Sequence, residues 1–120
     1  MDSPESKPYD LEERTELFAK RVRSFVRRLP RTICKFEDVK QLVRASGSVG
    51  ANYIEANESL GKRDFQMRVK IARKEAKETR YWLRLVDTNE NVELEGERQL
   101  LIQESTELMN ILAAILRKSI

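Results

Sequence analysis

The stretch QLVRASGSVGANYIEA, which spans residues 41–56, decides the fold. Its apolar and small residues recur every three or four positions, and this spacing places them on one face of a helix. Gly47 and Gly50 lie inside that pattern, although a glycine within a helix costs about 1 kcal/mol relative to alanine. A close contact with another helix offsets this cost, because small side chains let two backbones approach each other. We therefore expect a helix over about residues 37–60 that packs tightly against a neighbour.

The same spacing of apolar residues appears in three more segments. It predicts helices over about residues 10–29 and 64–88, and a fourth that begins between residues 92 and 97 and runs nearly to the last residue. Asp10 and Asp64 stand at two of the predicted starts and are candidate N-caps. No segment alternates apolar and polar residues for long enough to predict a strand.

Short connections between four amphipathic helices are typical of an all-α, antiparallel up-down-up-down four-helix bundle. We expect one such domain over residues 10–120, preceded by a flexible leader at residues 1–9 that contains two prolines and two serines.

The numbers of histidine and cysteine residues limit which catalytic and metal sites the chain can form. The 120 residues include no histidine and a single cysteine, Cys34, which excludes Ser-His-Asp and Cys-His triads and every zinc or haem site that needs histidine. Glu55 and Glu58, like Glu75 and Glu78, have the spacing of carboxylates in di-iron bundles. Those sites also need a Glu-x-x-His element, which cannot form here. We predict a non-enzymatic protein with no catalytic residue, no metal and no cofactor.

The location of the protein follows from features of the whole sequence. No apolar run approaches the ~20 residues that cross a bilayer. The first residues are acidic and polar, unlike a secretory signal. We therefore expect a cytoplasmic protein without a membrane partner.

Basic residues form rows on two of the predicted helices, and such rows suit contacts with the phosphates of RNA or DNA. The alternative is that they pair with the acidic segment from Asp87 to Glu107, which has seven acids against Arg98 alone. The candidate nucleic-acid-binding residues are Lys70, Arg73, Lys77, Arg80 and Arg84 on the third helix, and Lys20, Arg21, Arg23, Arg27, Arg28 and Arg31 on the first.

A second candidate feature is a polar row on the second helix. Ser48, Asn52 and Glu55 fall on one flank of it. If buried, these side chains need hydrogen-bond partners, most simply on the third helix. A structural polar network is the first interpretation, and a ligand pocket and ordinary solvation are the alternatives. The expected partners are Glu75, Glu78 and Arg80.

The helices also have more apolar residues than one stripe each requires. Examples are Leu17 and Val26 on the first helix, Leu85 on the third and Leu100 on the fourth. Part of this surplus can widen the core, and the rest predicts self-association, because soluble monomers seldom expose large apolar patches. Basic and acidic faces of neighbouring subunits can also pair head to tail.

Two runs of sequence resemble a known family. Residues 41–56 resemble the second-helix signature, and residues 71–85 (IARKEAKETRYWLRL) the third-helix signature, of the bacterial four-helix-bundle proteins named for 23S rRNA intervening sequences. That family includes the accessory variability protein of diversity-generating retroelements, a ring-shaped pentamer that works with a reverse transcriptase and nucleic acid. The resemblance implies a homo-oligomer, with a pentamer as the expected size, and nucleic-acid binding. It implies neither enzymatic activity nor a cofactor.

Residues and resemblance together favour an oligomeric, non-enzymatic bundle that contacts RNA or DNA through its first and third helices. The alternative is a protein-interaction adaptor, in which the same helices dock an acidic partner or a reverse transcriptase.

Overall fold

The computed structural model describes residues 10–31 and 33–120. The predicted leader at residues 1–9 lies outside this part of the chain, and so does the side chain of Cys34.

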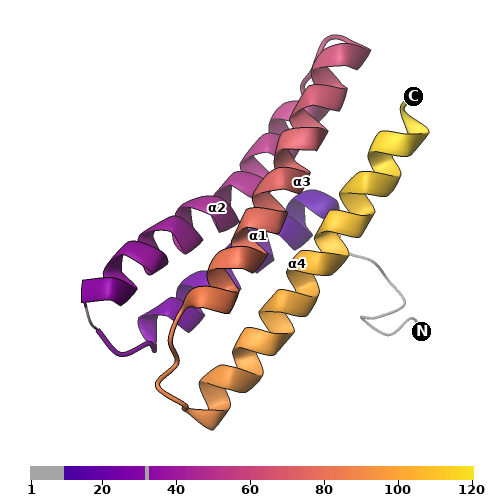
Figure 1. Cartoon of the computed structure of the whole chain (residues 1–120). Coiled ribbons are helices and arrows are strands. Elements are labelled where there is room, and N and C mark those ends of the chain that lie inside the picture. Colours follow the sequence, from indigo (N-terminus) through magenta and orange to yellow (C-terminus); the bar gives the residue numbers. More distant parts are fainter. Residues whose placement is uncertain (1–9, 32) are drawn as a thin grey trace.

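Four α-helices make up the fold: α1 (Leu11–Arg27), α2 (Ile33–Asn57), α3 (Lys62–Leu85) and α4 (Val92–Lys118). Figure 1 shows them running alternately up and down along one bundle, joined by short connections. Contacts join α1 to α2, α2 to α3, α3 to α4 and α4 back to α1. The described residues contain no strand. The predicted all-α four-helix bundle is therefore confirmed.

The apolar stripes predicted from the sequence meet along the bundle axis. Phe18 and Phe25 of α1 are each 1% exposed. The rest of the fully buried core is aliphatic, with valine, alanine and one leucine from α3 and leucines from α4. The main aliphatic contributors are Val22, Leu42, Val49, Val69, Ala72, Ala76, Leu83, Leu101, Leu108 and Leu112.

The tight contact predicted for α2 is a contact with α1. Gly50 is buried against Thr15, and a Cβ atom built on Gly50 would lie 2.8 Å from the Thr15 Oγ1 atom. The Thr15 hydroxyl donates a hydrogen bond to the carbonyl of Glu12 at 3.0 Å, and only 1% of the residue is exposed. Glycine at position 50 therefore sets how closely α1 and α2 approach.

The ends of the helices differ from the predicted ones by a few residues. Asp10 caps α1 by accepting a hydrogen bond from the Glu12 amide at 2.8 Å, as expected. The cap of α3 is Gly61, so the prediction of Asp64 is wrong. Asp64 instead lies in the first turn, where the helix dipole favours a carboxylate. The helix α2 ends at Asn57, three residues early.

The connection between α3 and α4 is well packed. Val86 and Thr88 follow the end of α3 and are buried, each 1% exposed. Asn89 and Glu90 adopt positive φ angles of 56° and 58°, which turns the chain back toward α4. Asn91 then caps α4 by accepting a hydrogen bond from the Leu94 amide at 3.0 Å. Within the described residues, no helix is long and apolar enough to cross a membrane.

Candidate nucleic-acid interface

Three basic side chains of the first helix and its C-cap, those of Arg14, Arg21 and Arg28, pair with acids of α4. Arg14 donates to both carboxylate oxygens of Glu104, at 2.7 and 2.8 Å, and to Glu107 at 2.9 Å. The hydrogen bond to Glu104 raises the pKa of the Arg14 guanidinium, although partial burial opposes this effect. Arg14 and Glu104 thus form a bidentate ion pair that joins the two helices.

The residues predicted on the first helix to bind nucleic acid divide into four groups. Arg21 and Arg28 pair with Glu97 and Glu93 of α4, at 3.9 and 3.3 Å. Lys20 pairs with Glu16 on its own helix at 3.0 Å. Arg23 turns toward α2 and donates to the Ser46 hydroxyl at 3.4 Å. Arg27 and Arg31 are exposed and lie at the end of the bundle. The pairing with α4 acids, which the sequence left as an alternative, thus describes Arg21 and Arg28.

The cations of α3 have different surroundings. Arg80 is half-buried and donates to the Thr106 hydroxyl at 3.1 Å. The other predicted residues make neither an ion pair nor a hydrogen bond with any part of the chain that the structure describes. Lys74, which is not one of the predicted residues, is exposed and equally unpaired within that part. We call these five cations the unpaired row of α3: Lys70, Arg73, Lys74, Lys77 and Arg84.

This contrast arises because α4 has two different sides. Its acids at positions 93, 97, 104 and 107 pair with α1. Its side toward α3 presents the neutral residues Thr106, Met109, Asn110 and Ala113 instead. Glu95 is an acid near the start of α4, and it pairs with Arg98 and accepts from Thr88. The Arg98 hydrogen bond lowers the pKa of the Glu95 carboxyl, so this acid remains charged beside its partner.

The unpaired row borders a groove between α3 and α4. Three of its members, Arg73, Lys74 and Lys77, line one wall. The groove has a volume of about 310 Å³, and its opposite wall consists of Met109, Asn110 and Ala113. Across this groove, cationic side chains of α3 face neutral side chains of α4.

A polar network does connect α2 with α3, but its partners differ from the predicted ones. Asn52 accepts a hydrogen bond from Arg68 at 3.3 Å and donates to the Ser48 carbonyl at 2.9 Å. Glu55 is exposed, and its carbonyl accepts from the Ser59 hydroxyl at 3.2 Å. Arginine is the linking residue because its fork of N–H groups reaches polar oxygens on a neighbouring helix.

Glu75 and Glu78 form a second, separate link between α3 and α2, through Arg44. The guanidinium of Arg44 lies 3.5 Å from Glu75 and 2.7 Å from Glu78. Trp82 also donates its indole N–H to Glu78 at 3.2 Å. Burial raises the pKa of the Glu78 carboxyl, but the hydrogen bonds from Trp82 and Arg44 outweigh burial and bring the pKa below its ordinary value. Glu78 is therefore a structural acid that holds α2 and α3 together.

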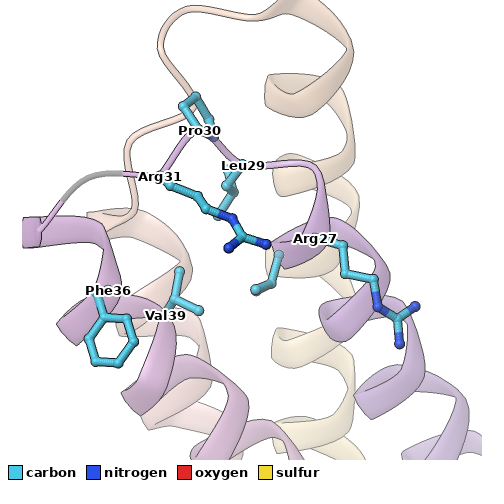
Figure 2. Close-up of a pocket in the computed structure, with 7 residues that line it drawn as sticks. Arg27, Leu29, Pro30, Arg31, Phe36 and Val39 are labelled. Carbon is cyan, nitrogen blue, oxygen red and sulfur yellow. The ribbon is translucent and has the colours of Figure 1, made fainter.

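A second pocket lies where α1 meets α2, and Figure 2 shows it. Its volume is about 320 Å³, and most of the residues that line it are apolar. Phe36, which is 66% exposed, lies on its α2 side. Arg31 extends across the space between the helices, whereas Arg27 points away from it (Figure 2). The other lining residues are Val26, Leu29, Pro30 and Val39.

The described residues contain no group of three or more cysteine and acidic side chains that is arranged to hold a metal ion. Of the two carboxylate pairs noted in the sequence, Glu75 and Glu78 bind Arg44.

The chain resembles known proteins both in sequence and in structure. Residues 9–114 match the sequence pattern of the 23S rRNA-intervening sequence proteins. A crystal structure from Bacteroides thetaiotaomicron, of a protein with unknown function from the S23 ribosomal protein family, superposes with a TM-score of 0.77. That protein is 31% identical in sequence, and the match covers 89% of this chain and 98% of the other. No curated protein matches the chain. Since the match covers nearly the whole bundle, the chain belongs to the 23S rRNA-intervening sequence protein family.

Proposed function

We propose that this protein is a non-enzymatic, cytoplasmic nucleic-acid-binding protein, and that the unpaired row of α3 contacts the phosphates. The observation that carries the proposal is the absence of partners for these cations among the described residues. From Lys70 to Arg84 the row runs 14 residues along one helix, which is about 21 Å at the helical rise. A row of this length can neutralise several successive phosphates and release their counterions.

The cations of α3 and those of α1 are not equally available to an anionic ligand. On α1, an anionic ligand has to compete with Glu93 and Glu97 for Arg28 and Arg21. An anionic ligand that binds the unpaired row of α3 has no such acid to displace among the described residues. Arg27 in the last turn of α1 and Arg31 in the connection to α2 are exposed and have no acidic partner among the described residues.

Reversing charges on α3 tests the proposal. The triple variant Arg73→Glu, Lys77→Glu, Arg84→Glu should lose binding to a random-sequence oligonucleotide in fluorescence anisotropy. It should also reduce the slope of log affinity against log salt by about 2–3, because each lost phosphate contact removes about 0.7–0.9. Arg80 is left in place because its bond to Thr106 supports the fold.

A matched control carries the same change in net charge. Lys40→Glu, Lys62→Glu, Lys118→Glu alters three exposed lysines outside the row. This variant should keep most of the salt dependence. Equal losses in both variants would mean that net charge alone governs binding, and an unchanged α3 variant would move the contact site away from α3.

We also propose that the chain forms a homo-oligomer, with the pentamer as the expected size. Leu17, Leu85 and Leu100 remain 40%, 46% and 54% exposed on three different helices, and apolar surface of this kind favours association. Val26, by contrast, packs against the core, as do Trp82, Ile102 and Met109. The α4 acids that suggested head-to-tail pairing already bind arginines of the same subunit, so apolar contact is the driving force that we propose.

Light scattering coupled to size exclusion measures the oligomer directly. The expected mass is about five times the 14.1 kDa of one chain at tens of micromolar protein. A mass of one chain under those conditions contradicts self-association.

The second candidate function is an adaptor that docks a partner protein, for which a reverse transcriptase is the natural first test. The pocket of Figure 2 favours it, because Phe36 and Val39 offer apolar contacts beside the cationic Arg31. That combination suits a partner segment with apolar and acidic residues. If the wild-type protein binds no nucleic acid even at low salt, the adaptor becomes the better function.

A further inference from the structure

The groove between α3 and α4 combines two kinds of wall. On the α3 side, Arg73, Lys74 and Lys77 supply positive charge, and none of them has a partner among the described residues. On the α4 side, Met109 and Ala113 supply apolar surface and Asn110 supplies an amide. A surface that binds its ligand by electrostatic attraction alone needs the cationic wall of α3. It gains nothing from the neutral wall of α4.

The charge of the groove is one-sided. None of the six residues that line it is acidic. The nearest acid along α4, Glu107, does not line the groove and binds Arg14 of α1. An anion that enters the groove therefore meets three cations without a carboxylate to displace. Arg73 is half-buried, and its planar guanidinium has the geometry that grips a phosphate through two hydrogen bonds.

The neutral wall suits the remainder of a nucleotide. Met109 packs partly against the core, so its polarizable side chain forms a fixed apolar surface. Ala113 is small enough to leave space above it. Asn110 is exposed, and its amide can both donate and accept hydrogen bonds, as the edge of a base or a sugar hydroxyl requires.

We propose that this groove holds one nucleotide of a single-stranded nucleic acid. The phosphate binds Arg73, Lys74 and Lys77, and the sugar and base lie against Met109, Ala113 and Asn110. In a duplex the bases stay stacked and paired, so none can lie with its face against Met109 and Ala113, whereas an unpaired base can be splayed out onto them. The protein should therefore prefer single strands. This inference rests on the proposed function, because the same row of α3 supplies its cations.

Filling the groove without changing any charge tests the inference. Ala113→Phe places a ring in the groove, whereas Ala114→Phe makes the same chemical change one position further along, about 100° around the helix. Ala114 does not line the groove. Fluorescence anisotropy with a 12-nucleotide single strand and with its duplex measures both variants. Circular dichroism and thermal melting check that each is folded.

Ala113→Phe should weaken single-strand binding by about tenfold, a loss in the range of one base contact. Its affinity for the duplex and the salt slope should stay near those of the wild type, as should both affinities of Ala114→Phe. A second variant covers the case in which Ala113→Phe does not fold. Asn110→Leu changes an exposed residue, so it should fold normally and weaken single-strand binding several-fold.

The outcomes separate this inference from the proposed function. If the α3 charge reversal abolishes binding while folded Ala113→Phe and Asn110→Leu bind single strands like the wild type, the groove inference is overturned and the proposed function stands. Equal losses for single strand and duplex in Ala113→Phe also overturn it. If the charge reversal leaves binding intact, the contact site lies away from α3, and the groove inference is overturned together with the proposed role of the row.

Discussion

Replacing Gly50 with leucine should unfold the protein or lower its melting temperature by many degrees. A Cβ atom at this position would lie 2.8 Å from the Thr15 Oγ1 atom and 3.2 Å from its Cβ atom, both closer than side chains normally pack. Overpacking of a core typically costs about 1–3 kcal/mol and sometimes more. For a domain of this size, 1 kcal/mol corresponds to a few degrees in melting temperature.

Thr15 cannot relieve this clash easily. It is fully buried, and its hydroxyl is bonded to the Glu12 carbonyl within the first turn of α1. A larger side chain at Gly50 must therefore push the two helix backbones apart. That movement also separates the core residues on either side of the contact, such as Phe18 and Val49.

The other glycines within helices provide matched controls. A Cβ atom at Gly96 meets nothing within 4 Å, so Gly96→Ala should stabilise the protein by about 0.5–1 kcal/mol through helix propensity. At Gly47, the Cβ atom lies 3.2 Å from the Nη2 atom of Arg23, the movable end of a long side chain. The stability of the Gly47→Ala variant should therefore fall between those of Gly50→Leu and Gly96→Ala. Thermal melting followed by circular dichroism ranks the series, and a Gly50→Leu variant as stable as Gly96→Ala would contradict the close-contact interpretation.

The sequence predicts the bundle well because helical burial is a local, periodic property. Leu42, Val49 and Ala56 repeat at helical spacing, and all three are buried in the structure. The ends of helices depend on contacts beyond that pattern. Leu60 continues the apolar spacing of α2, yet it lies beyond the end of the helix and is fully exposed. Val86 shows the reverse case, since it is buried after α3 has ended.

The candidate interface was harder to predict, because it depends on which helices face each other. The rows of basic residues on α1 and α3 look equivalent in the sequence. One available signal was the spacing of acids at positions 93, 97, 104 and 107, which places them on one side of α4. That this side faces α1 is a property of the packing. Asn110 has no distinguishing pattern in the sequence, and only the structure brings it beside Arg73 and Lys77.

The acidic side of α4 leads to the second large expected effect. Arg14→Met should destabilise the protein by about 1–3 kcal/mol in urea unfolding, because it leaves the Glu104 carboxylate without its partner. Both hydrogen bonds that the described residues make to Glu104 come from Arg14. The two side chains are only 24% and 15% exposed, so water cannot fully replace the lost bonds. Methionine keeps much of the length of the arginine side chain, which limits the loss of packing.

Two further variants show whether the cost comes from the unpaired acid. Lys20→Met breaks an ion pair with Glu16 whose side chains are 69% and 66% exposed, and exposed pairs contribute about 1 kcal/mol or less. The double variant Arg14→Met, Glu104→Leu removes both charges and should recover most of the stability, because an apolar pair can replace a buried ion pair at little cost. If Arg14→Met costs no more than Lys20→Met, the α1–α4 ion pair does not stabilise the bundle. The arginines of α1 would then be as available to an anionic ligand as the unpaired row of α3.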